Sequence, residues 1–279
     1  MNNSDNLLIR LPPTGSVLGV DVGFSPTKRS SAVCRLDWDD RQISWTIRRF
    51  RAAPPEQTET ISAVAGQYRL EAAAFDGPLR AGFEIIGQYR VADRLLTKRL
   101  QKKIGKPGQS NAPVGIRLNA AANVCVKIVL ANGQISPSAH AVAIDTKAVV
   151  EAFPTAFLGV MLRDPTTIAA ARKNRSDLFF QSLVASGSLQ LLMTYLLPDR
   201  FLTMSLEAVT NHDDRAALIC AITALCVAAG DFSAVGDSDG WIILPPRLFT
   251  RSWARADLEA NVADDGRPEC YYCTAPGSV

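Results

Sequence analysis

Short apolar runs, each with a carboxylate at one end or inside it, recur along the chain. The runs cover residues 17–20, 72–75, 149–153 and 218–222, and their acids are Asp21, Asp76, Glu151 and Asp214. The first three runs, alternating with helix-like segments, predict buried strands of an α/β sheet, and the fourth lies in a predicted helix. An acid at the end of a buried strand costs several kcal/mol of desolvation unless positive charge neutralises it. We therefore expect the four acids to converge at one sheet edge around bound cations.

Composition and charge place the chain among soluble globular proteins. It has 279 residues, of which 47% are hydrophobic and 20% charged, and a net charge of +3. No acidic residue lies between Asp93 and Asp145, and this stretch holds eight basic residues: Arg94, Lys98, Arg99, Lys102, Lys103, Lys106, Arg117 and Lys127. Such a surface attracts polyanions. A solvated helix face explains the same charges equally well.

Neither the N-terminal residues nor the cysteines indicate export. No run reaches the roughly 18 unbroken apolar residues of a membrane span, and residues 1–6 lack the charged and apolar pattern of a secretion signal. We expect a cytoplasmic protein whose six cysteines are reduced. Cys270 and Cys273 have the spacing of half a zinc site, but neither His140 nor His212 belongs to a paired motif that could complete it.

The order of elements predicts one domain. A strand at 17–22 followed by two alternating segments, 32–36 and 43–47, predicts an antiparallel meander. Further helices and strands follow: a helix at 57–70, a strand ending at Asp76, helices at about 88–103 and 119–130, a strand within 142–153, a helix at 177–197, a last helix at 211–229 and an extended piece at 241–244. We expect a single domain over 1–279, with a helical basic insertion at about 88–131 and a short C-terminal tail at about 251–279.

Each acid has a structural explanation as well as a functional one. Asp21 and Asp76 suit turns, but they lie side by side if their strands are neighbours. Glu151 sits inside an apolar strand, so either the strand is half exposed or the charge has a partner. Asp213 and Asp214 suit the positively polarised first turn of a helix. Asp214 lies on the flank of the apolar face of that helix and Asp213 nearly opposite, which makes Asp214 the expected ligand and Asp213 solvent-facing.

Four converging carboxylates would suit two divalent ions. Asp21 would bridge ions about 4 Å apart, the arrangement that activates a water and stabilises a leaving oxygen in phosphodiester cleavage. Hard oxygen ligands without a histidine pair favour Mg²⁺ or Mn²⁺ over Zn²⁺.

The chain resembles the domain of unknown function 429 family, whose members are described as predicted RNase H-like nucleases. The matching pieces span nearly the whole chain in order and comprise residues 19–23, 75–79, 89–93, 150–154, 175–177, 212–218, 220–221, 236–237 and 240–242. The resemblance implies an RNase H-like mixed sheet with flanking helices, and a site of Asp21, Asp76, Glu151 and an acid on the last helix. Members of the family often carry Asp-Ala where this chain has Ala216 and Ala217, which leaves Asp213 or Asp214 to supply that acid.

A metal-dependent nuclease is the function that these features predict, with DNA or RNA as its substrate. The expected contacts to phosphates are the basic residues Lys98, Arg99, Lys102, Lys103, Lys173 and Arg175. Two alternatives stay open. One is a nucleic-acid-binding protein of the same fold with weak or no catalysis. The other is an actin-like phosphotransferase, since residues 19–23, followed by Ser25, Thr27 and Lys28, resemble a phosphate loop.

Overall fold

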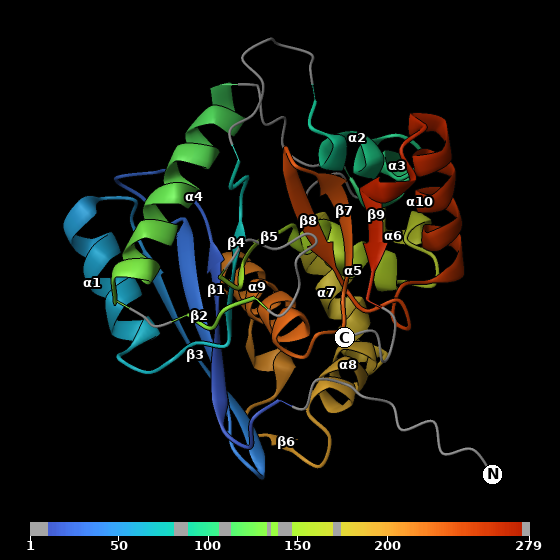
Figure 1. The fold of residues 1–279 in the computed structure, drawn as a ribbon. Coiled ribbons are helices and arrows are strands. Elements are labelled where there is room, and N and C mark those ends of the chain that lie inside the picture. The colour runs from blue at the N-terminus through green and yellow to red at the C-terminus, as the bar shows by residue number, and fades with distance from the viewer. Residues whose placement is uncertain are drawn as a thin grey trace.

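A nine-stranded mixed sheet with helices on both faces forms the fold (Figure 1). The computed structural model describes residues 11–80, 89–105, 113–132, 135–138, 147–169 and 174–274. The strand order is β6-β3-β2-β1-β4-β5-β8-β7-β9. The expected α/β class, with a mixed sheet and flanking helices, is confirmed.

The first three strands form the meander that the sequence predicts. β1 (Gly15–Asp21), β2 (Ser31–Trp38) and β3 (Gln42–Phe50) are antiparallel neighbours. Helix α1 (Pro54–Ala65) then returns the chain to β4 (Ala72–Asp76), which pairs in parallel with β1. β5 (Val149–Ala152) pairs in parallel with β4. The carboxyl ends of β1, β4 and β5 therefore meet at one edge of the sheet.

The strands from later in the chain extend the sheet at both sides. β8 (Gly240–Leu244) is parallel to β5, and β7 (Ser233–Asp237) and β9 (Tyr271–Cys273) follow in antiparallel pairs. The two-residue strand β6 (Phe201–Leu202) covers the start of β3. Residues 251–279, expected as a tail, contribute helix α10 (Ser252–Asp265), the 3-10 turn η2 (Pro268–Cys270) and β9, so the described part of this segment belongs to the sheet and its cover.

Two helical layers enclose the first half of the sheet. α1 and α4 (Pro113–Asn132) pack together over one face, and α9 (His212–Ala228) crosses the other (Figure 1). α9 lies very close to β1, because a Cβ on Gly19 would be 2.1 Å from the amide nitrogen of Ala221. Gly19 is thus explained by backbone-to-backbone packing, independently of any phosphate ligand.

A further group of helices packs on α9, directly or through α7. They are α5 (Pro154–Met161), the short α6 (Thr166–Ala169), α7 (Arg175–Ala185), α8 (Ser188–Leu196) and the 3-10 turn η1 (Leu206–Ala208). The single helix predicted at 177–197 is two helices. Gly187 has φ +71°, a left-handed conformation that ends one helix and precedes the next.

The helices of the expected basic insertion pack against two separate parts of the fold. α2 (Val91–Thr97) and α3 (Gln101–Ile104) pack near β7, α5 and α10, whereas α4 packs on α1 at the other end of the molecule (Figure 1). Of the described helices, α4 alone has the length and mean hydropathy, 1.5, of a helix that could cross a membrane.

Candidate metal site at the carboxyl ends of β1 and β4

Asp21 and Asp76 are direct neighbours at the ends of adjacent parallel strands. The register pairs them with one another, about 5 Å apart between backbones. Residues paired across a sheet point to the same face, and Gly19, two residues before Asp21, contacts α9. Both side chains therefore point to the face that α9 covers. Neither carboxylate has a hydrogen bond or an ion pair with any described residue.

The first turn of α9 brings two more acids to this pair. Asn211 caps the helix by accepting from the amides of Asp213, at 2.9 Å, and Asp214, at 3.3 Å. Asp214 approaches Arg49 of β3, with 3.6 Å between Oδ1 and Nε. Arg49 pairs with Ala32 and Ala32 with Asp21, so a basic side chain stands two strands away on the same face.

The pKa values of Asp21 and Asp76 are raised, in part because other negatively charged groups lie close to them. Burial, and then the charge of Glu151, raises the pKa of Asp76 to about 7, and His212 opposes this shift. Burial raises the pKa of Asp21 well above its ordinary value, and Asp76, Asp213 and Asp214 add to the shift in that order. Asp213 thus acts on Asp21 more strongly than Asp214 does. It is partly buried, as Asp214 is, and not the solvent-facing acid that the sequence predicts.

Glu151 lies on the other face of the sheet and has a partner. It pairs with Phe75, the residue before Asp76, so its side chain points away from α9. Arg90 donates to both of its oxygens, at 2.7 and 2.8 Å, and the amide of Leu79 donates at 3.2 Å. Arg90 is 1% exposed and also binds Asp93. Of the two explanations open for Glu151, the structure shows the partner.

The basic residues expected to contact substrate are partly engaged by α10. Arg99 donates to Asp264 at 2.5 Å and to Asn261 at 3.0 Å. Lys103 binds Asp257 at 2.6 Å. Lys98 and Lys102 are exposed and form no ion pair with a described residue. The acidic face of α10 therefore neutralises much of the charge that the sequence assigns to a substrate arm.

The remaining expected contacts lie near α7. Arg175 is partly buried in the first turn of α7, beside Gly105, and Lys173 is outside the described residues. Asp177 in the same turn binds Arg215 at 3.1 Å and His212 at 3.2 Å. These contacts fix α7 to the first turn of α9, and so they position the helix that carries Asp213 and Asp214.

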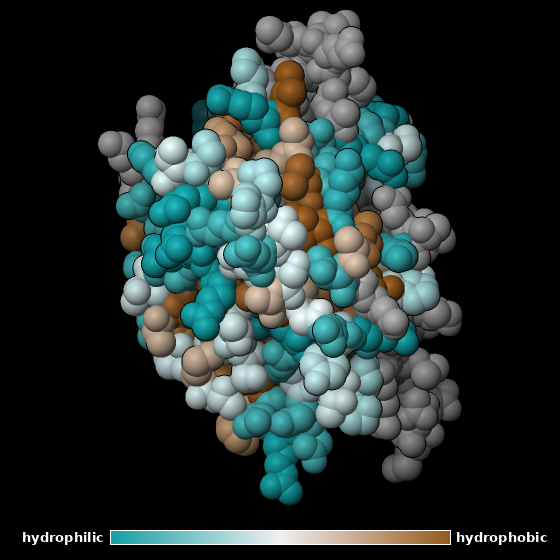
Figure 2. Space-filling view, turned by 90° about the vertical axis from the view of Figure 1, so that its left-hand side faces the viewer, coloured by the Kyte–Doolittle hydropathy of each residue, from teal (hydrophilic) through white to brown (hydrophobic). Residues whose placement is uncertain are grey.

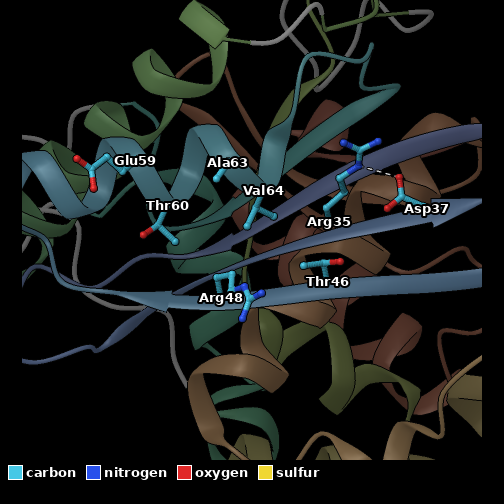
Figure 3. A pocket seen from close by; sticks show the side chains of 8 residues that line it. All are labelled: Arg35, Asp37, Thr46, Arg48, Glu59, Thr60, Ala63 and Val64. Atoms are coloured by element: carbon cyan, nitrogen blue, oxygen red, sulfur yellow. Dashed lines mark hydrogen bonds and ion pairs between the residues drawn. The ribbon is translucent and has the colours of Figure 1, made fainter.

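A pocket on the opposite face does not join this site. It has a volume of about 540 Å³ and lies between α1 and strands β2 and β3 (Figure 3). Arg35 enters it but is already engaged by Asp37 at 2.7 Å and by Ser16 at 3.0 Å. Arg48, from β3, is exposed there. Arg35 alternates with the β2 residues that face α9, so this pocket lies behind the sheet from Asp21.

The paired aspartates fit a hard divalent ion. Within the described ranges, no three histidine, cysteine or acidic side chains are grouped closely enough to hold one ion in common. Mg²⁺ does not require such a cage, because it keeps several waters and binds through one or two carboxylates together with substrate phosphates. Two unpartnered, adjacent carboxylates are such a donor set. Glu151 fits less well, since Arg90 occupies both of its oxygens.

The predicted site does not include Arg49 and Arg90, two basic residues that contact the acids of this region. Arg49 continues the alternation of Ile43, Trp45 and Ile47, so period-two patterning places it on the core face beside the acids. Arg90 precedes Asp93 by one helical turn, with apolar residues between, a pattern that indicates a buried ion pair. Both signals are present in the sequence.

Comparison with protein-family models, with curated proteins and with solved structures finds no match for this chain. The geometry of the site is therefore the basis for a proposed function.

Proposed function

We propose that the protein is a metal-dependent nuclease of RNase H-like fold, in which Asp21 and Asp76 hold Mg²⁺ or Mn²⁺. The observation that carries the proposal is the placement of these two carboxylates side by side without a partner among the described residues. Adjacent like charges at a partly buried position are unfavourable unless a cation or a proton neutralises them. The meander followed by parallel strands, with α9 across it, is compatible with the RNase H-like core that the family resemblance implies.

The residues around Asp21 and Asp76 would have different roles in the reaction. Asp213 and Asp214 add negative charge above the pair, and Arg49 supplies the positive charge that binds a neighbouring phosphate. When bound, the ion would polarise a phosphodiester and favour ionisation of an attacking water. Asp177 and Arg215 hold the first turn of α9 against this edge. Arg90 keeps Glu151 in place behind the sheet.

The test is metal-dependent cleavage of labelled DNA and RNA by the whole chain. The wild-type protein should cleave with Mg²⁺ or Mn²⁺, and Asp21→Asn should lower the rate at least about 100-fold, as loss of a group that stabilises transition-state charge does. Asp40→Asn is the matched control, because Asp40 is exposed in the turn between β2 and β3 at the other end of the strands. It should cleave as the wild type does.

Binding separates this proposal from the alternative of a non-catalytic nucleic-acid-binding protein. A nuclease should lose cleavage in Asp21→Asn and keep, or improve, its binding of nucleic acid, since the change removes negative charge. Binding without metal-dependent cleavage in the wild type would favour the alternative. Equal cleavage by the wild type and Asp21→Asn would reject the site.

A further inference from the structure

Phe24 and Arg117 form an exposed stack beside the two strand ends. The guanidinium of Arg117 lies 4.8 Å from the centre of the Phe24 ring, and Phe24 is still 38% exposed. Arg117 is exposed as well. A single exposed ring needs no explanation, and what distinguishes this one is its stacking with an arginine and its position beside Asp21 and Asp76.

Phe24 and Arg117 are each held close to one of the two strand ends that carry Asp21 and Asp76. Phe24 follows Asp21 by three residues, and the Gly23 between them donates its amide to Ser31 Oγ at 2.9 Å. A Cβ on Gly23 would be 2.2 Å from the carbonyl oxygen of Ser30, so the loop turns tightly there. Arg117 belongs to the first part of α4, which Asn119 anchors by donating to the carbonyl of Pro78 at 2.7 Å. Pro78 follows Asp76 by two residues, so each strand end positions one partner of the stack.

The loop after β1 and helix α4, which carry the stack, are rich in apolar and basic residues. Val114 and Ile116 are 53% and 57% exposed next to Arg117 along the chain. Figure 2 views the side of the molecule that carries α1 and α4, and apolar side chains gather there in an upright stripe. No acidic residue lies between Asp21 and Asp37 or anywhere in α4, and Lys28 is exposed in the same loop as Phe24. A polyanion with a flat apolar group matches this combination of charge and ring.

We propose that Phe24 and Arg117 are a stacking platform for an unpaired base, which makes a single nucleic-acid strand the substrate class of the site. The inference rests on the proposed nuclease function and deepens it. Bases stack on aromatic rings and on arginine planes when they are not already stacked and paired in a duplex. With Phe24 within about 11 Å of Asp21 by chain length, a base on the platform belongs to a nucleotide close to the scissile phosphate.

The experiment measures binding of fluorescent oligonucleotides of about 12 nucleotides to the full chain with EDTA present, so that cleavage does not interfere. The probes are a single DNA strand, the same sequence as RNA, and the DNA duplex. Phe24→Ala should weaken single-strand binding at least about fivefold and leave duplex binding unchanged. Phe24→Trp should retain the wild-type affinity. Phe201→Ala is the matched control, since Phe201 is 60% exposed at the far edge of the sheet.

The platform is rejected if Phe24→Ala binds the single strand as tightly as the wild type does, or if it loses as much affinity for the duplex as for the single strand. It is also rejected if Phe24→Trp binds the single strand as weakly as Phe24→Ala, or if the wild type binds no oligonucleotide. Arg117→Ala provides a second route if Phe24→Ala does not fold, and it should weaken single-strand binding as well. Platform-dependent binding without metal-dependent cleavage would reject the nuclease proposal alone. Cleavage that needs Asp21 but binding that ignores Phe24 would reject the platform alone.

Discussion

Two neighbouring places on this sheet hold acids that are buried or partly buried, and they differ in how the negative charge is neutralised. Behind the sheet, Glu151 is bound through both oxygens by Arg90, which Asp93 also contacts. On the α9 side, Asp21 and Asp76 lie together with no hydrogen bond or ion pair to a described residue. The strands that carry Asp76 and Glu151 are adjacent. The same edge thus contains one internally compensated carboxylate and one uncompensated pair.

The uncompensated pair is the place on this sheet where a ligand would contribute most to stability. A compensated buried charge keeps its place without any outside partner, and removing its counterion is costly. An uncompensated pair destabilises the protein by itself, so such a pair persists where a cation or a proton is part of its use. Stability measurements on each side of the sheet can therefore separate structural acids from functional ones.

Arg90→Met should have the largest effect. It leaves Glu151 and Asp93 buried without their cation, and we expect a loss of about 3–5 kcal/mol in the free energy of unfolding. Urea denaturation measures this loss. Arg29→Met is the matched control, because Arg29 is 60% exposed in its pair with Glu56 and such a pair contributes less than about 1 kcal/mol. Similar losses for the two variants would mean that Arg90 does not stabilise the fold by compensating the charges of Glu151 and Asp93.

Asp76→Asn should have the opposite sign in the metal-free protein. The pKa of Asp76 is raised to about 7 from an ordinary value of 3.8. The folded protein therefore holds the proton more tightly than the unfolded chain, and stability is lost as pH rises through the window from about 4 to 7. The asparagine removes this loss. The full shift corresponds to about 4 kcal/mol, and because solvent screens the partly exposed carboxylate the variant should be more stable than the wild type by about 2 kcal/mol at pH 8, with a smaller gain as pH falls toward 4.

Denaturation in EDTA at several pH values checks this expectation. Adding Mg²⁺ should then stabilise the wild type and not Asp76→Asn, which shrinks the difference. Asp40→Asn should follow the wild type throughout. A destabilised Asp76→Asn protein at pH 8 would show that Asp76 has a favourable partner, and the contrast between the two sides of the sheet would fail.

The sequence predicts the fold better than it predicts the site. Alternation at Ile43, Trp45 and Ile47 and the short apolar runs identify the meander and the strands beside it, because burial pattern is local information. The sequence also indicates that Asp21 and Asp76 meet if their strands are neighbours, which the register shows. The face on which Glu151 points depends on the register of β5 against β4, and local pattern does not fix that register.

Charge partners are the other part that local patterns miss. Arg99 and Lys103 belong to a stretch without acids, which predicts a basic surface, yet Asp264 and Asp257 of α10 bind them from far along the chain. Pairing across such a separation depends on tertiary packing. The basic surface of the fold therefore differs from the basic stretch of the sequence.

Glu151→Gln should have the smallest effect on the free energy of unfolding. It tests most directly whether this acid is a structural ion-pair partner or a metal ligand. Glutamine keeps the shape and one acceptor for Arg90, and Asp93 still compensates the guanidinium, so we expect a loss of about 1 kcal/mol. Mn²⁺ affinity, measured by calorimetry, should fall by less than about tenfold, because the Glu151 side chain points to the other face of the sheet and acts on Asp76 through its charge alone. Loss of an outer-shell group that orients a metal ligand typically lowers affinity about 10- to 100-fold. A drop larger than this range in Glu151→Gln would restore Glu151 as the metal ligand that the sequence predicts, and would require Arg90 to release it when the ion binds.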